Sequence, residues 1–404
     1  MSGPHSFKAS RRSDIAPFIV MEMMAAANAR AAGGAEVLHL EVGEPGGGAP
    51  PAAVAAAAAA MATGNCGYTE AFGLRTLRQA IARRYDLDHA VAVDPGRIAM
   101  TAGASGAFIL AFLAAFDAGH RVIVTDPGYP AYRNILHALG IEVVRVATDL
   151  STRFQPTPAL LDQVSGPVHG LILASPSNPT GTMLSGPELA ELAAYCGRRG
   201  IRIVSDEIYH GITYGEPADS MLAYADDAIV VNSFSKFFGM TGWRLGWLVL
   251  PEELVAPATR LAQNLFISAP AIAQHAALGA MSDLPELERR VQHFRRNRDH
   301  LLRALRAAGL TRMAPADGAF YLYVDISSVA ADSLQFCRRL LDETGVALTP
   351  GVDFDPERGH RYVRLSFAGP EAEVRTAADR LAAWLRRMAA KQGVRSDDLA
   401  AADA

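Results

Sequence analysis

The fold is decided by residues 201–250, which read IRIVSDEIYHGITYGEPADSMLAYADDAIVVNSFSKFFGMTGWRLGWLVL. Three β-rich runs lie within this stretch, at 201–206, 228–233 and 243–250. They are mostly apolar without strict alternation, which is typical of strands that are covered on both faces of a sheet. The stretch therefore predicts buried strands separated by loops.

Runs of the same kind recur upstream, and helical segments such as Gly106–Phe116 and Glu188–Arg199 lie between several of them. Buried strands that alternate with helices form mostly parallel sheets flanked by those helices. We therefore predict an α/β fold with a mostly parallel seven-stranded sheet between helices. Its strands are expected at 97–101, 121–126, 142–147, 170–175, 201–206, 228–233 and 243–250.

The pattern changes near Pro285. A long charged helix at 287–308 is followed by β-rich runs at 318–326 and 361–367, which predicts a smaller α+β domain. The N-terminal segment contains too little to fold alone, and we expect it to pack on this domain. The expected parts are a large α/β domain at 48–284, a small α+β domain built from 1–47 and 285–392, and a flexible tail at 393–404.

The composition of the 404-residue chain argues against several classes of protein. Its 38 Lys and Arg and 42 Asp and Glu leave a net charge of −4, which gives no general reason to bind nucleic acid. The N-terminus lacks the apolar segment of a secretory signal. The uncharged stretch Ile98–Phe116 is interpreted as a strand followed by its helix, and Ala52–Ala62 as a helix, so neither is expected to span a membrane.

Cys66, Cys196 and Cys337 are odd in number and widely spaced, which favours a reducing cytoplasm. The histidines lack metal-ligand spacing, so no metal site is expected.

Polar residues gather directly after the predicted strands, at the sheet edge where such folds bind ligands. Lys236 lies among Phe234, Phe237 and Phe238. Loss of hydration there lowers the pKa of its amine toward a nucleophilic value. Asp206 ends a buried strand, where a carboxylate is unfavourable unless it pairs with a cation.

A phosphate site is predicted beside these two groups. The turn Gly103-Ala104-Ser105 opens a helix and offers unpaired N–H groups at the positive end of its dipole. Hydroxyl and guanidinium donors are added by Ser233, Ser235 and Arg244. A phosphate-bearing aldehyde with a protonatable ring nitrogen would satisfy the lysine, the carboxylate and these donors together. Pyridoxal phosphate is such a molecule, and we predict it as the cofactor.

The segment Ser233-Phe-Ser-Lys236-Phe-Phe-Gly-Met-Thr-Gly-Trp-Arg244-Leu-Gly resembles the lysine motif of class I aminotransferases. These belong with class II to the pyridoxal-phosphate enzymes of fold type I, the aspartate aminotransferase superfamily. A single match of this kind is weak, but the matches span roughly residues 40–370 in the family's order. The others are Tyr68-Thr-Glu-Ala-Phe-Gly-Leu, Asp126-Pro-Gly-Tyr129-Pro, Asn178-Pro-Thr-Gly, Ser205-Asp206-Glu-Ile-Tyr209 and Arg364-Leu-Ser-Phe.

The resemblance implies a role for each matched residue. Lys236 would hold the cofactor's aldehyde as a Schiff base and then shuttle a proton to and from the substrate Cα. Asp206 would keep the ring nitrogen protonated, Tyr209 and Asn178 would bind the phenolic oxygen, and Tyr129 would stack on the ring. The expected catalytic residues are Lys236, Asp206 and Tyr209. The expected phosphate ligands are Gly103, Ala104, Ser105, Ser233, Ser235 and Arg244, with Tyr68 reaching the site of the other subunit.

The same resemblance implies a homodimer with shared active sites and a substrate-binding set. Arg364 would bind the substrate α-carboxylate with its forked guanidinium, beside Asn178. Gly43 would let the backbone approach that carboxylate. The segment that begins at Ile15 is expected to fold over the site as a lid, with Phe18 shaping the side-chain pocket.

The predicted reaction is transamination, in which an L-amino acid gives its amino group to the cofactor and a 2-oxo acid takes it back. A C–S β-lyase of the same fold stays open as an alternative, because it would use the same lysine. A pyridoxal-phosphate-sensing transcription regulator is a further alternative. It is disfavoured because at most ~45 residues precede the catalytic pattern, too few for a DNA-binding module.

Overall fold

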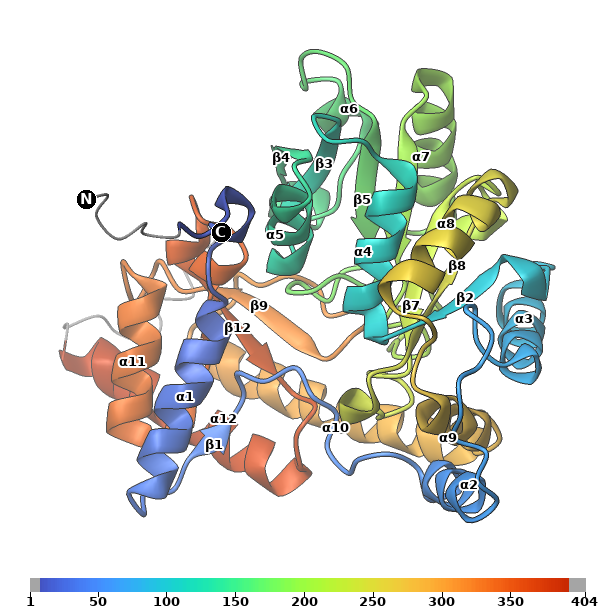
Figure 1. The fold of residues 1–404 in the computed structure, drawn as a ribbon. Coiled ribbons are helices and arrows are strands. Elements are labelled where there is room, and N and C mark those ends of the chain that lie inside the picture. The colour runs from blue at the N-terminus through green and yellow to red at the C-terminus, as the bar shows by residue number, and fades with distance from the viewer. Residues whose placement is uncertain (1–7, 392–404) are drawn as a thin grey trace, which may run out of the picture.

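The computed structural model describes residues 8–391, and its centre is a seven-stranded sheet (Figure 1). The strand order is β2-β8-β7-β6-β5-β3-β4, in which β8 runs antiparallel to both neighbours and the other pairs are parallel. The predicted α/β fold with a mostly parallel sheet is therefore confirmed. The strands are β2 (Ile98–Thr101), β3 (Arg121–Asp126), β4 (Glu142–Ala147), β5 (Gly170–Ala174), β6 (Arg202–Asp206), β7 (Ile229–Ser233) and β8 (Gly246–Val249).

Helices cover both faces of this sheet, which explains why its strands are apolar without alternation. Neighbouring residues of one strand point to opposite faces: Val122 packs in one apolar cluster and Ile123 in another. The first cluster is closed by α4 (Gly103–Ala115), α5 (Pro130–Ala138) and α8 (Glu252–Leu265), and the second by α6 (Pro158–Leu161) and α7 (Gly186–Arg199).

The C-terminal elements form a second unit around a small antiparallel sheet of order β11-β12-β9. The N-terminal elements join it, because β1 pairs in parallel with β10 and α1 lies beside β10 and β11 (Figure 1). The domain boundaries stay a prediction, and the tail at 393–404 lies outside the described residues. The elements are α1 (Ile19–Ala32), β1 (Leu38–His39), α10 (Leu284–Ala307), β9 (Tyr321–Asp325), α11 (Ser333–Thr344), β10 (Val346–Ala347), β11 (Thr349–Pro350), β12 (Tyr362–Ser366) and α12 (Glu371–Lys391).

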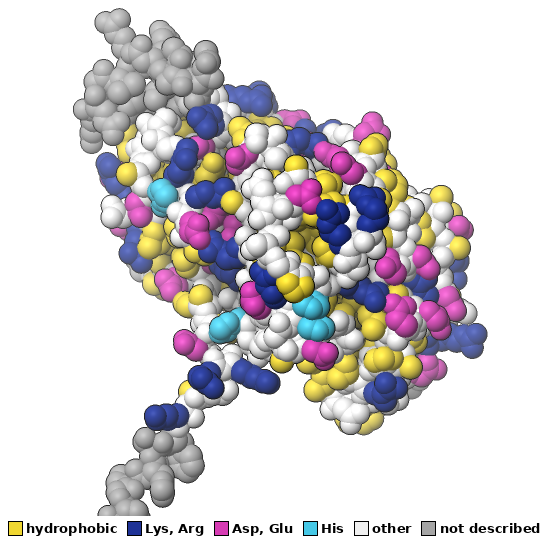
Figure 2. All heavy atoms as spheres, turned by 90° about the horizontal axis from the view of Figure 1, so that it is seen from above, with side chains coloured by type: hydrophobic (Ala, Val, Ile, Leu, Met, Phe, Trp, Pro, Cys, Tyr) yellow, Lys and Arg dark blue, Asp and Glu magenta, His cyan; other side chains and the backbone are white. Residues whose placement is uncertain are grey.

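Three more helices, α2 (Pro51–Ala62), α3 (Arg75–His89) and α9 (Ala271–Met281), complete the chain. The alanine-rich α2 packs so closely on α9 that a Cβ at Gly279 would overlap the Ala52 carbonyl group. Within residues 8–391, no helix combines the length and apolar character needed to cross a membrane. Basic and acidic side chains are interspersed on the face shown in Figure 2.

Candidate active site

The predicted site residues converge on the carboxyl ends of the central strands. Asp206 is the last residue of β6 and Ser233 the last residue of β7. Asn178 follows β5, and Gly103 is the first residue of α4. Segments from both terminal parts of the described chain reach the same place, since the Gly43 carbonyl group after β1 contacts Lys236 and the Arg364 guanidinium of β12 contacts Asn178.

Lys236 lies in the loop after β7 with its amine held away from bulk water. Its Nζ donates to the Gly43 carbonyl oxygen at 2.7 Å and lies 5.9 Å from the centroid of the Phe320 ring. Burial, and then the positive charge of Arg364, lower the pKa of this amine to about 8. A useful fraction of the amine is therefore neutral and nucleophilic near neutral pH.

Asp206 is a buried carboxylate whose partners are neutral groups. The Tyr132 hydroxyl donates to its Oδ2, and the Ile208 backbone N–H donates to its Oδ1 at 3.1 Å. Burial raises the pKa of Asp206 to about 6, while both hydrogen bonds favour the charged form. The carboxylate is thus ionised at neutral pH and can hold a proton-bearing ring nitrogen. Sequence reasoning missed Tyr132, because its bond to Asp206 joins two residues that are far apart in the sequence.

A cradle for an anion lies at the start of α4. Gly103 has φ of +73°, and a Cβ there would lie 2.5 Å from Nη2 of Arg244. No side chain caps this helix, so the first backbone N–H groups of α4, which include those of Ala104 and Ser105, have no such partner. The hydroxyl groups of Ser233 and Ser235 lie 2.9 Å apart alongside. Backbone donors, a guanidinium and hydroxyl groups at a helix N-terminus suit a phosphate.

Arg364 and Asn178 form a buried polar pair. Arg364 Nη1 donates to Asn178 Oδ1 at 3.0 Å, and its Nη2 donates to the Glu41 carbonyl oxygen at 2.6 Å. The guanidinium lies 4.4 Å from the Tyr321 ring centroid, and its buried Nε has no hydrogen-bond partner. A buried donor without a partner is unfavourable, and a carboxylate would satisfy it.

Tyr321 is a second residue that sequence reasoning missed. Its hydroxyl lies 2.9 Å from the Tyr209 hydroxyl, and it occupies the space that a Cβ at Gly43 would need. Only glycine therefore fits at position 43 without moving Tyr321. The signal was weak, because Tyr321 is one aromatic residue of an apolar β-rich run.

Two aromatic residues, Tyr129 and Phe18, pack beside this cluster, and a third, Tyr68, lies outside it. Tyr129 lies edge-on to Tyr132 at 5.4 Å, and its ring centroid is 6.0 Å from that of Phe18. Phe18 is fixed because the next backbone N–H groups, at the start of α1, donate to the Asp353 carboxylate. Tyr68, in contrast, exposes 85% of its surface, so the single chain leaves its side chain outside the buried cluster.

The residues present fit pyridoxal phosphate. The cradle at Gly103 suits its phosphate, the Lys236 amine suits its aldehyde, and Asp206 suits its ring nitrogen. The unpartnered Nε of Arg364 leaves a place for the carboxylate of a substrate. Within residues 8–391, no group of three or more histidine, cysteine or carboxylate side chains is placed to hold a metal ion.

Comparison with known proteins gives a consistent result. The family model described as aminotransferase class I and II matches residues 35–381. Valine--pyruvate aminotransferase from Mycobacterium tuberculosis is 44% identical over 93% of this chain and 97% of its own length. A crystal structure of an aminotransferase from Mycobacterium tuberculosis superimposes with a TM-score of 0.93 at 44% identity, covering 95% of this chain and 100% of that one. Aspartate aminotransferase from Thermus thermophilus, solved with maleate, gives a TM-score of 0.88 at 32% identity, with 94% and 100% covered.

We predict that the Lys236 amine of the cofactor-free protein reacts half-maximally with acetic anhydride near pH 8. Burial lowers the pKa of this amine to about 8, so its neutral, reactive form appears as the pH rises through that value. The chain has three lysines, Lys8, Lys236 and Lys391, so mass spectrometry of peptides resolves each.

The control is the urea-unfolded protein, in which the Lys236 profile should move toward the ordinary lysine pKa of about 10.4. Identical Lys236 profiles in folded and unfolded protein would contradict the prediction.

Proposed function

The chain belongs to the class I and II aminotransferases, which use pyridoxal phosphate, and we propose that it transfers the amino group of a neutral, apolar L-amino acid to pyruvate or a similar 2-oxo acid. The observation that carries the proposed assignment of the site is the grouping of partly buried Lys236 with buried Asp206 and Arg364. Each of the three places a charged group near the strand ends, and the hydrogen-bond partners of each are neutral.

The roles of these residues follow from their surroundings. Bound pyridoxal phosphate supplies an aldehyde that receives the amino group and a ring that takes up the electron pair released at Cα. Lys236 Nζ, whose pKa is lowered, would take the proton from the substrate Cα and deliver it to C4′ of the cofactor, and in the second half-reaction it would move a proton the other way. Asp206 would keep the ring nitrogen protonated, and Tyr209 and Asn178 would orient the phenolic oxygen.

We assign binding of the substrate α-carboxylate to Arg364, Asn178 and the backbone at Gly43. The planar guanidinium presents parallel N–H groups that match two carboxylate oxygens. Stacking against the rings of Tyr321 and Phe354, at 4.4 and 4.8 Å, fixes its plane. The assigned residues therefore recognise the carboxylate that all amino-acid donors share.

The apolar character of the amino donor is supported by two observations. Phe18 and Tyr129 place aromatic surface at the site, which suits an uncharged side chain. The 44% identical relative is named valine--pyruvate aminotransferase. Among the alternatives, a C–S lyase and a transcription regulator receive no support from the relatives compared above, which are aminotransferases.

We further propose that two copies share their active sites through Tyr68. Its exposed ring projects from an ordered loop, because Gln274 binds Thr69 Oγ1 at 3.2 Å and the Leu74 N–H at 2.7 Å. A large aromatic residue held rigidly in solvent suits contact with a partner. In the dimer Tyr68 would reach the phosphate of the other subunit.

Two finer assignments complete the proposal. The large domain comprises 48–284, and the small domain combines the N-terminal segment with 285–392. We place the enzyme in the cytoplasm, in keeping with its unpaired Cys66, Cys196 and Cys337.

Screening amino donors against pyruvate and 2-oxoglutarate tests the proposed function. We expect valine and other neutral apolar donors with pyruvate to exceed aspartate in kcat/KM by at least about tenfold, since an apolar pocket leaves a charged side chain unpaired. A preference for aspartate, or product formed from a donor without any 2-oxo acid, would overturn the proposal.

Arg364→Lys should raise KM for every donor by about tenfold or more, because a single point charge replaces the forked guanidinium.

Subunit mixing tests the shared site. Tyr68→Ala and Lys236→Ala homodimers should each have low activity. Co-expression of the two chains with different tags creates a heterodimer in which one site has both an intact Tyr68 and an intact Lys236. We expect a random mixture to recover about a quarter of the wild-type activity. A mixture no more active than the better parent would show that Tyr68 does not act across the interface.

A further inference from the structure

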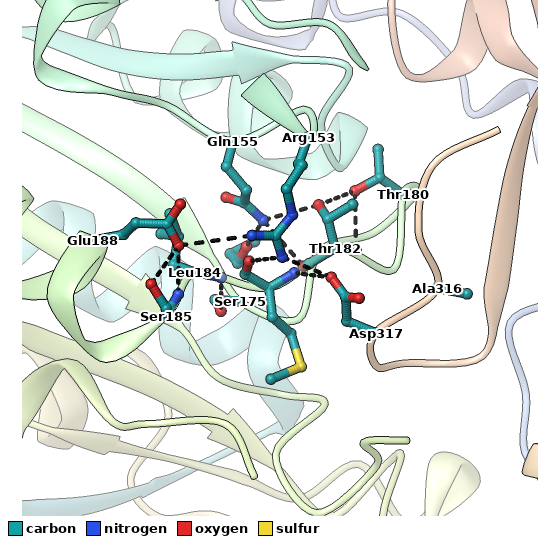
Figure 3. Close-up of polar contacts among 12 residues, drawn as sticks. Arg153, Gln155, Ser175, Thr180, Thr182, Leu184, Ser185, Glu188, Ala316 and Asp317 are labelled. Carbon is teal, nitrogen blue, oxygen red and sulfur yellow. Dashed lines mark hydrogen bonds and ion pairs between the residues drawn. The ribbon is translucent and has the colours of Figure 1, made fainter. Parts of the chain in front are cut away.

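Two consecutive residues between β4 and α6 adopt a conformation that the sequence alone gives no reason to expect. Arg153 and Phe154 have φ of 54° and 57°, in the left-handed region that side chains disfavour. Such positions cost on the order of 1 kcal/mol each and persist only where the surroundings hold them. The next residue, Gln155, is only 4% exposed. Figure 3 shows Arg153 and Gln155 lying side by side and pointing toward the loop that contains Thr180 and Thr182.

Gln155 closes the loop that carries Asn178. Its Nε2 donates to the carbonyl oxygen of Thr182 at 3.0 Å, to Thr182 Oγ1 at 3.1 Å and to the Ala174 carbonyl oxygen at 3.3 Å (Figure 3). One amide thus joins the end of β5 to the far side of the loop. Within the loop, the Ser177 N–H donates to the same Thr182 carbonyl oxygen at 3.0 Å. Asn178 lies next to Ser177, inside the segment that these bonds hold.

Arg153 joins this loop to the C-terminal unit. Its Nη2 donates to Asp317 Oδ2 and to the Met183 carbonyl oxygen, both at 2.9 Å (Figure 3). The Met183 N–H donates back to Asp317 Oδ2 at 3.3 Å, and the Gly318 N–H donates to the Gly181 carbonyl oxygen at 2.9 Å. The Arg153–Asp317 ion pair is partly exposed, so its own energy is small. Its effect is on geometry, since it fixes the loop against the segment that leads to β9.

Phe154 contacts two neighbours of Arg364, which is the other partner of the Asn178–Arg364 pair. Its buried ring meets the rings of Tyr323 and Tyr362 edge-on, at 5.7 and 6.0 Å. Tyr323 on β9 lies directly opposite Arg364 on β12 in the antiparallel register. Residues 153–155 therefore contact the supports of both Asn178 and Arg364, although these two belong to different parts of the fold.

We propose that Gln155 is a positioning residue for transamination: it holds the 175–182 loop so that Asn178 faces Arg364 at the spacing needed to bind the substrate carboxylate. Arg153 and Phe154 fix the segment from which Gln155 reaches the loop. This role rests on the proposed function, because it takes from there that Asn178 and Arg364 bind the carboxylate. Gln155 itself touches neither substrate nor cofactor, so it acts through Asn178.

Gln155→Leu in the holoenzyme tests the proposal, because leucine keeps much of the volume and removes the amide donor. We expect KM for the amino donor to rise about tenfold while kcat stays within about threefold, the pattern of lost binding rather than lost chemistry. The Kd of 3-methylbutanoate, a carboxylate that cannot react, should rise by the same factor in an absorbance titration of the bound cofactor. In an Asn178→Ala background, Gln155→Leu should change neither constant further, because two residues that act through one contact are not additive.

Ser333→Ala is the matched control. It also removes a buried hydrogen bond from a side chain to a carbonyl oxygen, that of Gly359 at 3.0 Å, but α11 is remote from the loop. The control should lower thermal stability and leave KM unchanged. Should Gln155→Leu not fold, Thr182→Val removes one of the same bonds, and KM should rise in the same direction.

Arg364→Lys in the same assays separates the two proposals. If Arg364→Lys leaves KM and the carboxylate Kd unchanged, the proposed carboxylate site itself is wrong. If Arg364→Lys raises both constants but Gln155→Leu, or Thr182→Val in its place, leaves them within twofold of wild type, the role of Gln155 is overturned. A full Gln155→Leu effect in the Asn178→Ala background would also overturn it.

Discussion

The structure depends on burying the charged groups of Asp206 and Arg364, and partly burying that of Lys236, without pairing the three to one another. Burying an unpaired charge is strongly unfavourable, so such groups need close polar partners. Lys236 has a carbonyl oxygen, Asp206 has a hydroxyl and a backbone N–H, and Arg364 has an amide and a carbonyl oxygen. Neutral partners stabilise each charge while leaving it available to a ligand, which a direct ion pair between two of these residues would not do.

Meeting this constraint requires both ends of the chain. The Glu41 and Gly43 carbonyl groups come from the segment after β1, which pairs with β10, and Arg364 comes from β12. The carboxyl edge of the sheet provides the site with Asp206 and with the loop that contains Asn178. The site therefore forms only when the terminal segments are docked on the large sheet. Residues 153–155 lie where the docked C-terminal unit meets the loop of Asn178, since Arg153 pairs with Asp317 and Phe154 packs on Tyr323.

Much of this arrangement could be predicted from the sequence. Most strands of the sheet are buried on both faces and are therefore apolar runs, which allowed all seven to be predicted close to their observed bounds, although the edge strand β4 is largely exposed. The residues around Lys236 and Asp206 also lie in short motifs, where neighbours in sequence suffice to indicate chemistry. Tyr132, Tyr321 and Gln155 were not predicted, because each acts through a contact with a residue far away in the sequence. No local pattern encodes the Tyr132–Asp206 bond, or the left-handed backbone that places Gln155 under its loop.

Of the proposed roles, covalent binding of the cofactor by Lys236 is the one on which the others rest. Borohydride reduction of the holoenzyme, followed by mass spectrometry of its peptides, tests it most directly. The chain has three lysines, so the reduced cofactor has three candidate lysine attachment sites. We expect the pyridoxyl group on the peptide containing Lys236 and on no other. A pyridoxyl group on Lys8 or Lys391, or an unmodified Lys236 in yellow, active protein, would contradict it.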